Sequence, residues 1–153
     1  MGLDMFLIAK RYFWSNANDD EKLKELIIKG IFPEMKKFNL NYLSFEVGYW
    51  RKANQIHKWF VDNVQDGNDD CGSYDVSKEK LRQLRNMCEE ALKAIKRKDI
   101  EKAEELLPTQ DGFFFGSKEY DQYYIEDLKQ TIKIIDACLK LPDDWDLEYS
   151  SSW

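Results

Sequence analysis

The residues best suited to chemistry are concentrated in residues 46–60. This segment holds the only histidine of the chain together with amide, cationic and indole groups, at Trp50, Arg51, Asn54, His57, Lys58 and Trp59. Arg51 and Lys58 supply local positive charge, which suits an anionic ligand or an acidic partner surface. His57 and Asn54 would add polar contacts beside an aromatic wall, as in many ligand sites. The alternative, which we favour, is a core histidine bonded to a backbone carbonyl or to Glu46, because any buried polar group needs a partner.

A second aromatic cluster occupies residues 113–124. Three phenylalanines, ending at Phe115, are followed by Gly116, Ser117 and Tyr120. Backbone N–H groups at the start of a helix can hold a phosphate or a carboxylate, and aromatic rings can stack on a base or sugar. These residues are therefore the second half of a candidate ligand site. The simpler interpretation is a buried loop anchor followed by a capped helix, because every helix begins with free donors and few bind ligands.

Signatures of catalysis and of metal binding are weak. His57 and Cys71 form the one nucleophile and base pair, but no spacing requires that they meet. Asp66, Asn68 and Asp70 alternate as in a calcium loop, yet Cys71 replaces the glycine and Ser77 the bidentate glutamate. A turn explains these residues better, and no ligand pair has zinc spacing. We predict neither a metal nor a cofactor.

Composition and charge restrict the class of protein. The 153 residues are 43% hydrophobic and 34% charged, which predicts one domain over 1–153 with a real core. A net charge of -6 argues against general binding to nucleic acid or anionic membranes. Three cysteines without short-range pairing, and a first segment that resembles neither a signal peptide nor a membrane span, indicate a cytoplasmic protein.

Strands are expected at three places. Residues 3–13 are rich in Phe, Leu, Ile and Tyr. From Asn41 to Tyr49 the pattern alternates, with an apolar side at Leu43, Phe45, Val47 and Tyr49. The tail, residues 145–153, alternates loosely and can pair with the first strand. We therefore expect a small antiparallel sheet.

The remaining periodicity is helical and predicts a mostly helical α+β fold with four main helices. The main helices are expected at 20–29, capped by Asn18 or Asp19 and stopped by Gly30, near 50–64, from the Ser77 cap to about 98, and from Ser117 to Pro142. A further short helix is expected at 100–107 after the Asp99 cap. Residues 46–60 then span a strand-to-helix junction or form one long helix. Its inner stripe contains Trp50, Ile56, His57 and Phe60, and its outer face contains Arg51, Gln55, Lys58 and Trp59. An exposed Trp59 would mark an interface unless a neighbouring helix covers it.

Three segments, residues 1–5, 46–60 and 107–121, resemble a family of small proteins carried by bacteriophages and prophages. The family has no established activity, so the resemblance implies a viral accessory setting and assigns no functional residue. Accessory proteins in that setting commonly bind a host protein or sequester a nucleotide signal, which blunts host defence.

Three functional hypotheses follow. The first is a non-enzymatic binding protein that counters host defence through a small anionic or nucleotide-like ligand, or through a host defence protein, in the host cytoplasm. Its site would combine the residues of the two aromatic clusters named above. The second is an acidic inhibitor that mimics nucleic acid at a host protein surface, with carboxylates at Asp66–Asp70 and Asp143–Asp144. The third is a small hydrolase that uses His57 with Glu46 or Asp70. The oligomeric state is left open.

Overall fold

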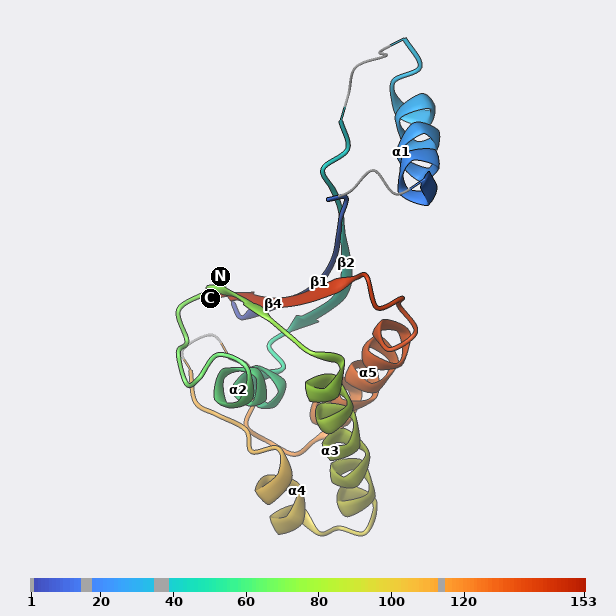
Figure 1. Ribbon diagram of the computed structural model, residues 1–153. Helices are drawn as coiled ribbons and strands as arrows, with labels where there is room; N and C mark the ends of the chain where they lie inside the picture. Colours follow the sequence, from blue (N-terminus) through green and yellow to red (C-terminus); the bar gives the residue numbers. More distant parts are fainter. Residues whose placement is uncertain (1, 15–17, 35–38, 113–114) are drawn as a thin grey trace.

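The computed structural model describes residues 2–14, 18–34, 39–112 and 115–153. Within these ranges the chain forms an antiparallel sheet and five helices (Figure 1). In spatial order the strands are β2 (Tyr42–Arg51), β1 (Asp4–Tyr12), β4 (Asp146–Ser152) and β3 (Ser73–Asp75). The helices are α1 (Asn18–Ile31), α2 (Asn54–Asn63), α3 (Lys78–Lys96), α4 (Ile100–Leu106) and α5 (Gln122–Cys138). The predicted α+β fold is confirmed, and β1 pairs with both the second and the C-terminal strand as expected.

Several boundaries differ from the prediction. Helix α1 continues through Gly30, which a helix tolerates at a cost of about 1 kcal/mol, and the proposed caps at Asn18 and Asp19 lie outside the described side chains. Strand β3 follows the predicted turn at Asp66–Asp70 and was not expected, because pairing with the distant β4 rather than a local pattern holds it. Helix α5 begins after Asp121, whose carboxylate accepts from Tyr123 N and Tyr124 N, and not at Ser117.

The junction between β2 and α2 settles the choice left open for residues 46–60. The strand ends at Arg51 and the helix begins at Asn54, so one continuous helix is wrong. Lys52 turns the chain with a φ of 60°. Its N–H donates to Leu3 O at 2.8 Å and its carbonyl accepts from Asn54 N at 2.9 Å. The junction is therefore bonded both to the first strand and to the first turn of α2.

A register shift between β1 and β2, at Val47 of β2, changes which side of β2 is buried. The shift lies between Leu7 and Ile8. Beyond it Trp50 is buried, whereas Tyr49 is partly exposed and lies 5.6 Å from the ring of Phe6. The predicted apolar side of β2 is therefore wrong at Tyr49, because an irregularity of one residue exchanges the two faces of a strand. Phe45 is opposite the buried Ala9, on the predicted face, but it is 52% exposed.

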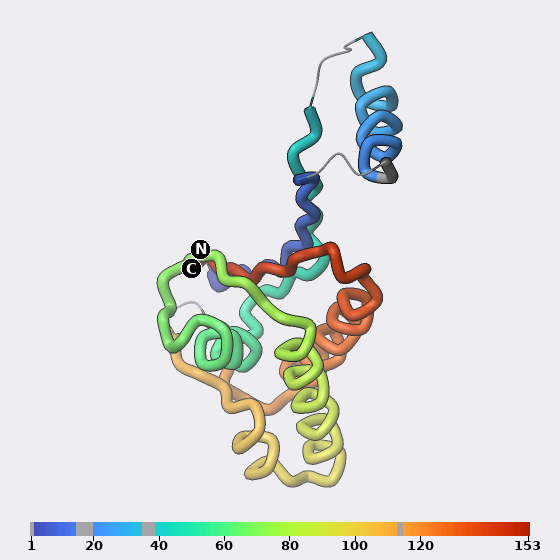
Figure 2. The backbone as a smooth tube through the Cα atoms, in the orientation of Figure 1, coloured from blue at the N-terminus to red at the C-terminus, as the bar shows by residue number. Residues whose placement is uncertain are grey.

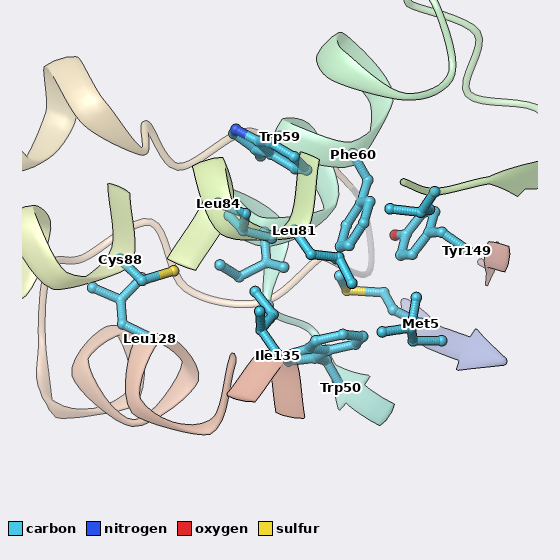
Figure 3. Packing of buried hydrophobic residues seen from close by; sticks show 14 of the residues in the cluster. Met5, Trp50, Trp59, Phe60, Leu81, Leu84, Cys88, Leu128, Ile135 and Tyr149 are labelled. Carbon is cyan, nitrogen blue, oxygen red and sulfur yellow. The ribbon is translucent and has the colours of Figure 1, made fainter. Parts of the chain in front are cut away.

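Helices α2 to α5 cover one face of the sheet and enclose the core (Figure 1). Alternate residues of β1 face these helices and are completely buried, at Leu3, Met5, Leu7 and Ala9. Figure 3 shows Trp50 beside Ile135, and Trp59 beside Leu84 of α3. Trp59 is only 5% exposed and Gln55 only 2%, so the predicted outer face of α2 is wrong at both positions. Neighbouring helices cover that face, which periodicity within one helix cannot reveal.

Local capping follows the sequence closely in the other helices. Ser77 accepts a hydrogen bond from Lys80 N at the start of α3, and Asp99 accepts one from Lys102 N at the start of α4. Both predicted caps are confirmed. The described helices include none long and apolar enough to cross a membrane.

The hairpin of β1 and β2 extends beyond the rest of the sheet and carries α1 at its far end (Figure 2). We call this projection the arm, residues 10–14, 18–34 and 39–45. Six of the ten exposed large hydrophobic side chains of the described chain lie on it, at Trp14, Leu26, Ile31, Phe32, Tyr42 and Phe45. The arm therefore exposes apolar surface that the core does not use.

One carboxylate in the contact between α2 and α5 is destabilised by its position. Burial raises the pKa of Asp127 to about 6, with smaller contributions from Asp121 and Glu126, and the bond from Gln55 Nε2 opposes the shift. Because the folded pKa lies above the unfolded value, the folded state binds this proton more tightly. The resulting stability is fully present below the unfolded pKa and is lost as the pH rises through about 6.

Asp127→Asn should therefore flatten the decline in the free energy of unfolding between about pH 4 and pH 6. At neutral pH the variant should be more stable by about 1 to 2 kcal/mol, less than a full two-unit shift implies because the group is only half-buried. Urea unfolding across this pH range measures both effects. Glu126→Gln, on the exposed side of α5, removes only one of the smaller contributions and should retain most of the decline. An unchanged decline in Asp127→Asn would contradict the assignment.

Candidate functional site

His57 is completely buried and bonded through both ring nitrogens. Its Nδ1 lies 2.7 Å from the Tyr149 hydroxyl of β4, and its Nε2 lies 3.1 Å from Asp69 Oδ2. The ring of Phe115 packs against the imidazole edge-on at 5.4 Å. Helix α2, strand β4 and two loops thus meet at this one side chain.

The partners determine which nitrogen of a neutral His57 carries the proton. A carboxylate only accepts hydrogen bonds, so Nε2 donates to Asp69, and Nδ1 accepts from the Tyr149 hydroxyl. Burial, reinforced by the charges of Asp69 and Cys71, holds the pKa of Tyr149 well above its ordinary value. The phenol therefore keeps the proton that it donates.

This arrangement confirms a core histidine but corrects its expected partners. Glu46 lies on an exposed part of β2, so the predicted bond to Glu46 is wrong. Asp70 accepts instead from Gly72 N and from the Tyr74 hydroxyl, as the turn interpretation of this loop expects. Since Tyr149 and Asp69 occupy both ring nitrogens, His57 forms no dyad with Cys71.

Asn54 joins the two aromatic clusters. Its Nδ2 donates to Phe115 O at 3.0 Å and to Ser117 O at 2.9 Å, and its Oδ1 accepts from Gln110 N at 3.0 Å. These bonds use both donors and one acceptor lone pair of a buried amide along one loop. The described parts of the two clusters therefore meet in space, but Asn54 holds the loop and has no donor left for a ligand.

Only some of the other predicted site residues lie near His57 and Asn54. Trp50 is buried and donates to Thr131 Oγ1 at 2.8 Å. Arg51, the next residue of the strand, points to the opposite face of the sheet. Lys58 is paired with Asp62, and Tyr120 packs on Tyr124 with ring centroids 4.8 Å apart. Phe115, Gly116 and Ser117 lie at the end of the sheet near His57, while residues 113 and 114 lie outside the described chain.

Left-handed backbone is concentrated around the same end of the sheet. Lys52 has a φ of 60°, Cys71 of 57° and Gly116 of 94°. A Cβ on Gly116 would lie 3.0 Å from both Cβ and O of Lys52, so the two loops are in close contact. Non-glycine residues in this conformation cost of order 1 kcal/mol or more, and such strain is frequent at functional sites.

Sequence reasoning missed the C-terminal residue Trp153. Its indole N–H donates to Asp69 Oδ1 at 2.9 Å, and its ring meets Phe115 edge-on at 6.1 Å. The side chain is still 51% exposed. Together with Lys52, Gly116 and Ser117, all exposed, it forms what we call the Trp153 surface. The one available signal was the alternation of residues 145–153, which gave the strand but not what its last residue contacts.

Two features of the Trp153 surface leave binding capacity open. The ammonium group of Lys52 has no ion-pair partner among the described residues. Ser151, two residues before Trp153, is only 6% exposed, and its hydroxyl lacks a partner in the described chain. No group of three or more His, Cys, Asp or Glu side chains in the described ranges could hold a metal ion. The available groups thus suit an anion and a planar ring.

Comparison with protein-family models, with curated proteins and with solved structures gave no match to this chain. The site therefore has to be interpreted from its own geometry.

Replacing His57 with Asn should lower the free energy of unfolding by about 2 to 4 kcal/mol, because it removes a buried ring and breaks two hydrogen bonds. Urea unfolding measures the loss. Lys58→Ala, one residue along the same helix, should change stability by less than about 0.5 kcal/mol. Normal stability in His57→Asn together with loss of an enzymatic activity would instead support the hydrolase hypothesis.

Gly116→Ala should destabilise the protein more than Gly67→Ala. Both glycines have positive φ, at 94° and 81°, but a Cβ at Gly67 meets nothing within 4 Å. Gly67→Ala therefore measures backbone strain alone, about 1 kcal/mol, and Gly116→Ala adds the contact with Lys52. Thermal unfolding compares the two variants, and equal losses would show that the contact carries no energy.

Proposed function

We propose that this chain is a non-enzymatic binding protein whose Trp153 surface holds a small anionic, nucleotide-type ligand. The observation that carries the proposal is that the loop at Phe115 and Gly116 contacts both Lys52, whose ammonium has no ion pair among the described residues, and Trp153, whose indole is half-exposed. An ammonium attracts phosphate, and an indole stacks on a base. In the phage setting that the sequence resemblance implies, sequestering such a signal would counter host defence.

The burial of His57 and Tyr149 favours a binding function over catalysis. His57 and Tyr149 have no exposed surface, and each satisfies the other. A general base must reach the proton that it abstracts, and neither side chain can do so from inside the core. The polar network beneath the surface instead fixes Phe115 and Trp153, whose rings border it.

The acidic-inhibitor hypothesis is weakened because most of the carboxylates on which it depends are bonded within the protein. Asp69 and Asp70 are bonded within the chain, Asp143 pairs with Lys78, and Asp144 pairs with Arg11. Carboxylates already paired in this way present little free charge to a host protein.

Isothermal titration with cyclic nucleotides, cyclic dinucleotides and ADP-ribose-type nucleotides tests the ligand. We expect saturable heat with at least one of them. Lys52→Ala and Trp153→Ala should each weaken that binding about tenfold or more, because each removes one of the two proposed contacts.

Lys118→Ala is the matched control, because Lys118 lies in the loop of Gly116 and Ser117 but is paired with Asp111. This variant should bind normally. Circular dichroism confirms that the variants fold. Absence of heat across the whole panel, or equal weakening by the control, would contradict the proposal.

A further inference from the structure

A groove lies at the opposite end of β4 from Trp153. It has a volume of about 560 Å³ and runs along β4 at the root of the arm, between β3 and the first turn of α3. Four carboxylates and a single ammonium group line it, at Asp75, Asp143, Asp146, Glu148 and Lys78. We call it the acidic groove.

Internal ion pairs neutralise only half of these carboxylates. Lys78 Nζ lies 2.9 Å from Asp143 Oδ1, and Glu148 is paired with Lys10 of β1. These contacts hold the pKa values of both acids below their ordinary values. The exposed carboxylates of Asp75 and Asp146 have neither an ion pair nor a hydrogen bond within the described residues. The groove therefore keeps unbalanced negative charge.

An aromatic ladder leads out of the acidic groove onto the arm. Tyr12 lines the groove and stacks on Trp14, with ring centroids 5.3 Å apart and planes 25° from parallel. Tyr12 also meets Tyr42 of the paired strand at 5.6 Å. Trp14 is 86% exposed, and Tyr42 51%. Side chains of this size rarely stay in water without a contact to make, so the ladder indicates an interface.

We infer that the acidic groove and the ladder bind an extended arginine-rich segment of a partner protein. Guanidinium groups pair with carboxylates through two parallel hydrogen bonds and stack on aromatic faces, so one residue type satisfies both halves of the surface. Lysine would satisfy the carboxylates but stack less well. The groove is a separate site from the Trp153 surface, and the inference does not depend on the nucleotide proposal.

Fluorescence anisotropy with a short labelled arginine-rich peptide tests the inference on the full chain. We expect saturable binding that weakens as salt rises, and weaker binding of a lysine-rich peptide of equal length. Asp75→Asn combined with Asp146→Asn should weaken binding about tenfold or more, and Trp14→Ala should weaken it without affecting the fold.

Glu101→Gln combined with Glu104→Gln, both exposed on α4, removes the same net charge and should leave binding unchanged. Equal weakening by this pair would show long-range attraction only and overturn the inference. So would unchanged binding in the groove variants. Sedimentation of the free protein tests the remaining alternative, that a second copy of the chain occupies the groove. A dimer that the peptide dissociates would support that alternative and overturn the inference.

Discussion

The buried imidazole of His57 is the contact on which the arrangement of this protein most depends. Its two nitrogens connect α2 to β4 through Tyr149 and to the following loop through Asp69, and Asp69 in turn holds Trp153. Each group in this series of hydrogen bonds is the partner of the next. Since a buried polar group without a partner is costly, His57 and Tyr149 stabilise each other in the core, and Asp69 and Trp153 are positioned by them.

A consequence is that the polar core and the exposed surface above it have different tasks. The polar groups of Asn54 and His57 are bonded to neighbouring segments of the chain, so these side chains do not contact a ligand directly. The exposed groups Lys52 and Trp153 gain fixed positions from that framework. A preorganised surface of this kind loses less conformational entropy when it binds, so even few contacts can be selective.

Charge is also divided along the length of β4. At one end Lys52 and Trp153 both adjoin the loop at Phe115 and Gly116, and at the other lie the carboxylates of Asp75 and Asp146, which are unpaired within the described residues, beside an aromatic ladder. The net charge of -6 conceals this division. The two ends suit ligands of opposite charge, and the arm extends the acidic end away from the core (Figure 1).

The sequence alone determined the elements whose signals are local. Hydrophobic periodicity predicted β1, β2, β4 and most helices but not β3. Ser77 and Asp99 marked helix starts because a cap bonds to a backbone group only a few residues away. It also identified a core role for His57. Only the tertiary structure decided that Asp69 and Tyr149 are its partners, that Trp59 is covered and that Trp153 joins the surface, because these contacts link residues far apart in the chain. The register shift beside Leu7 belongs to the same group, since pairing between two strands, and not the pattern of either one, sets which face is buried.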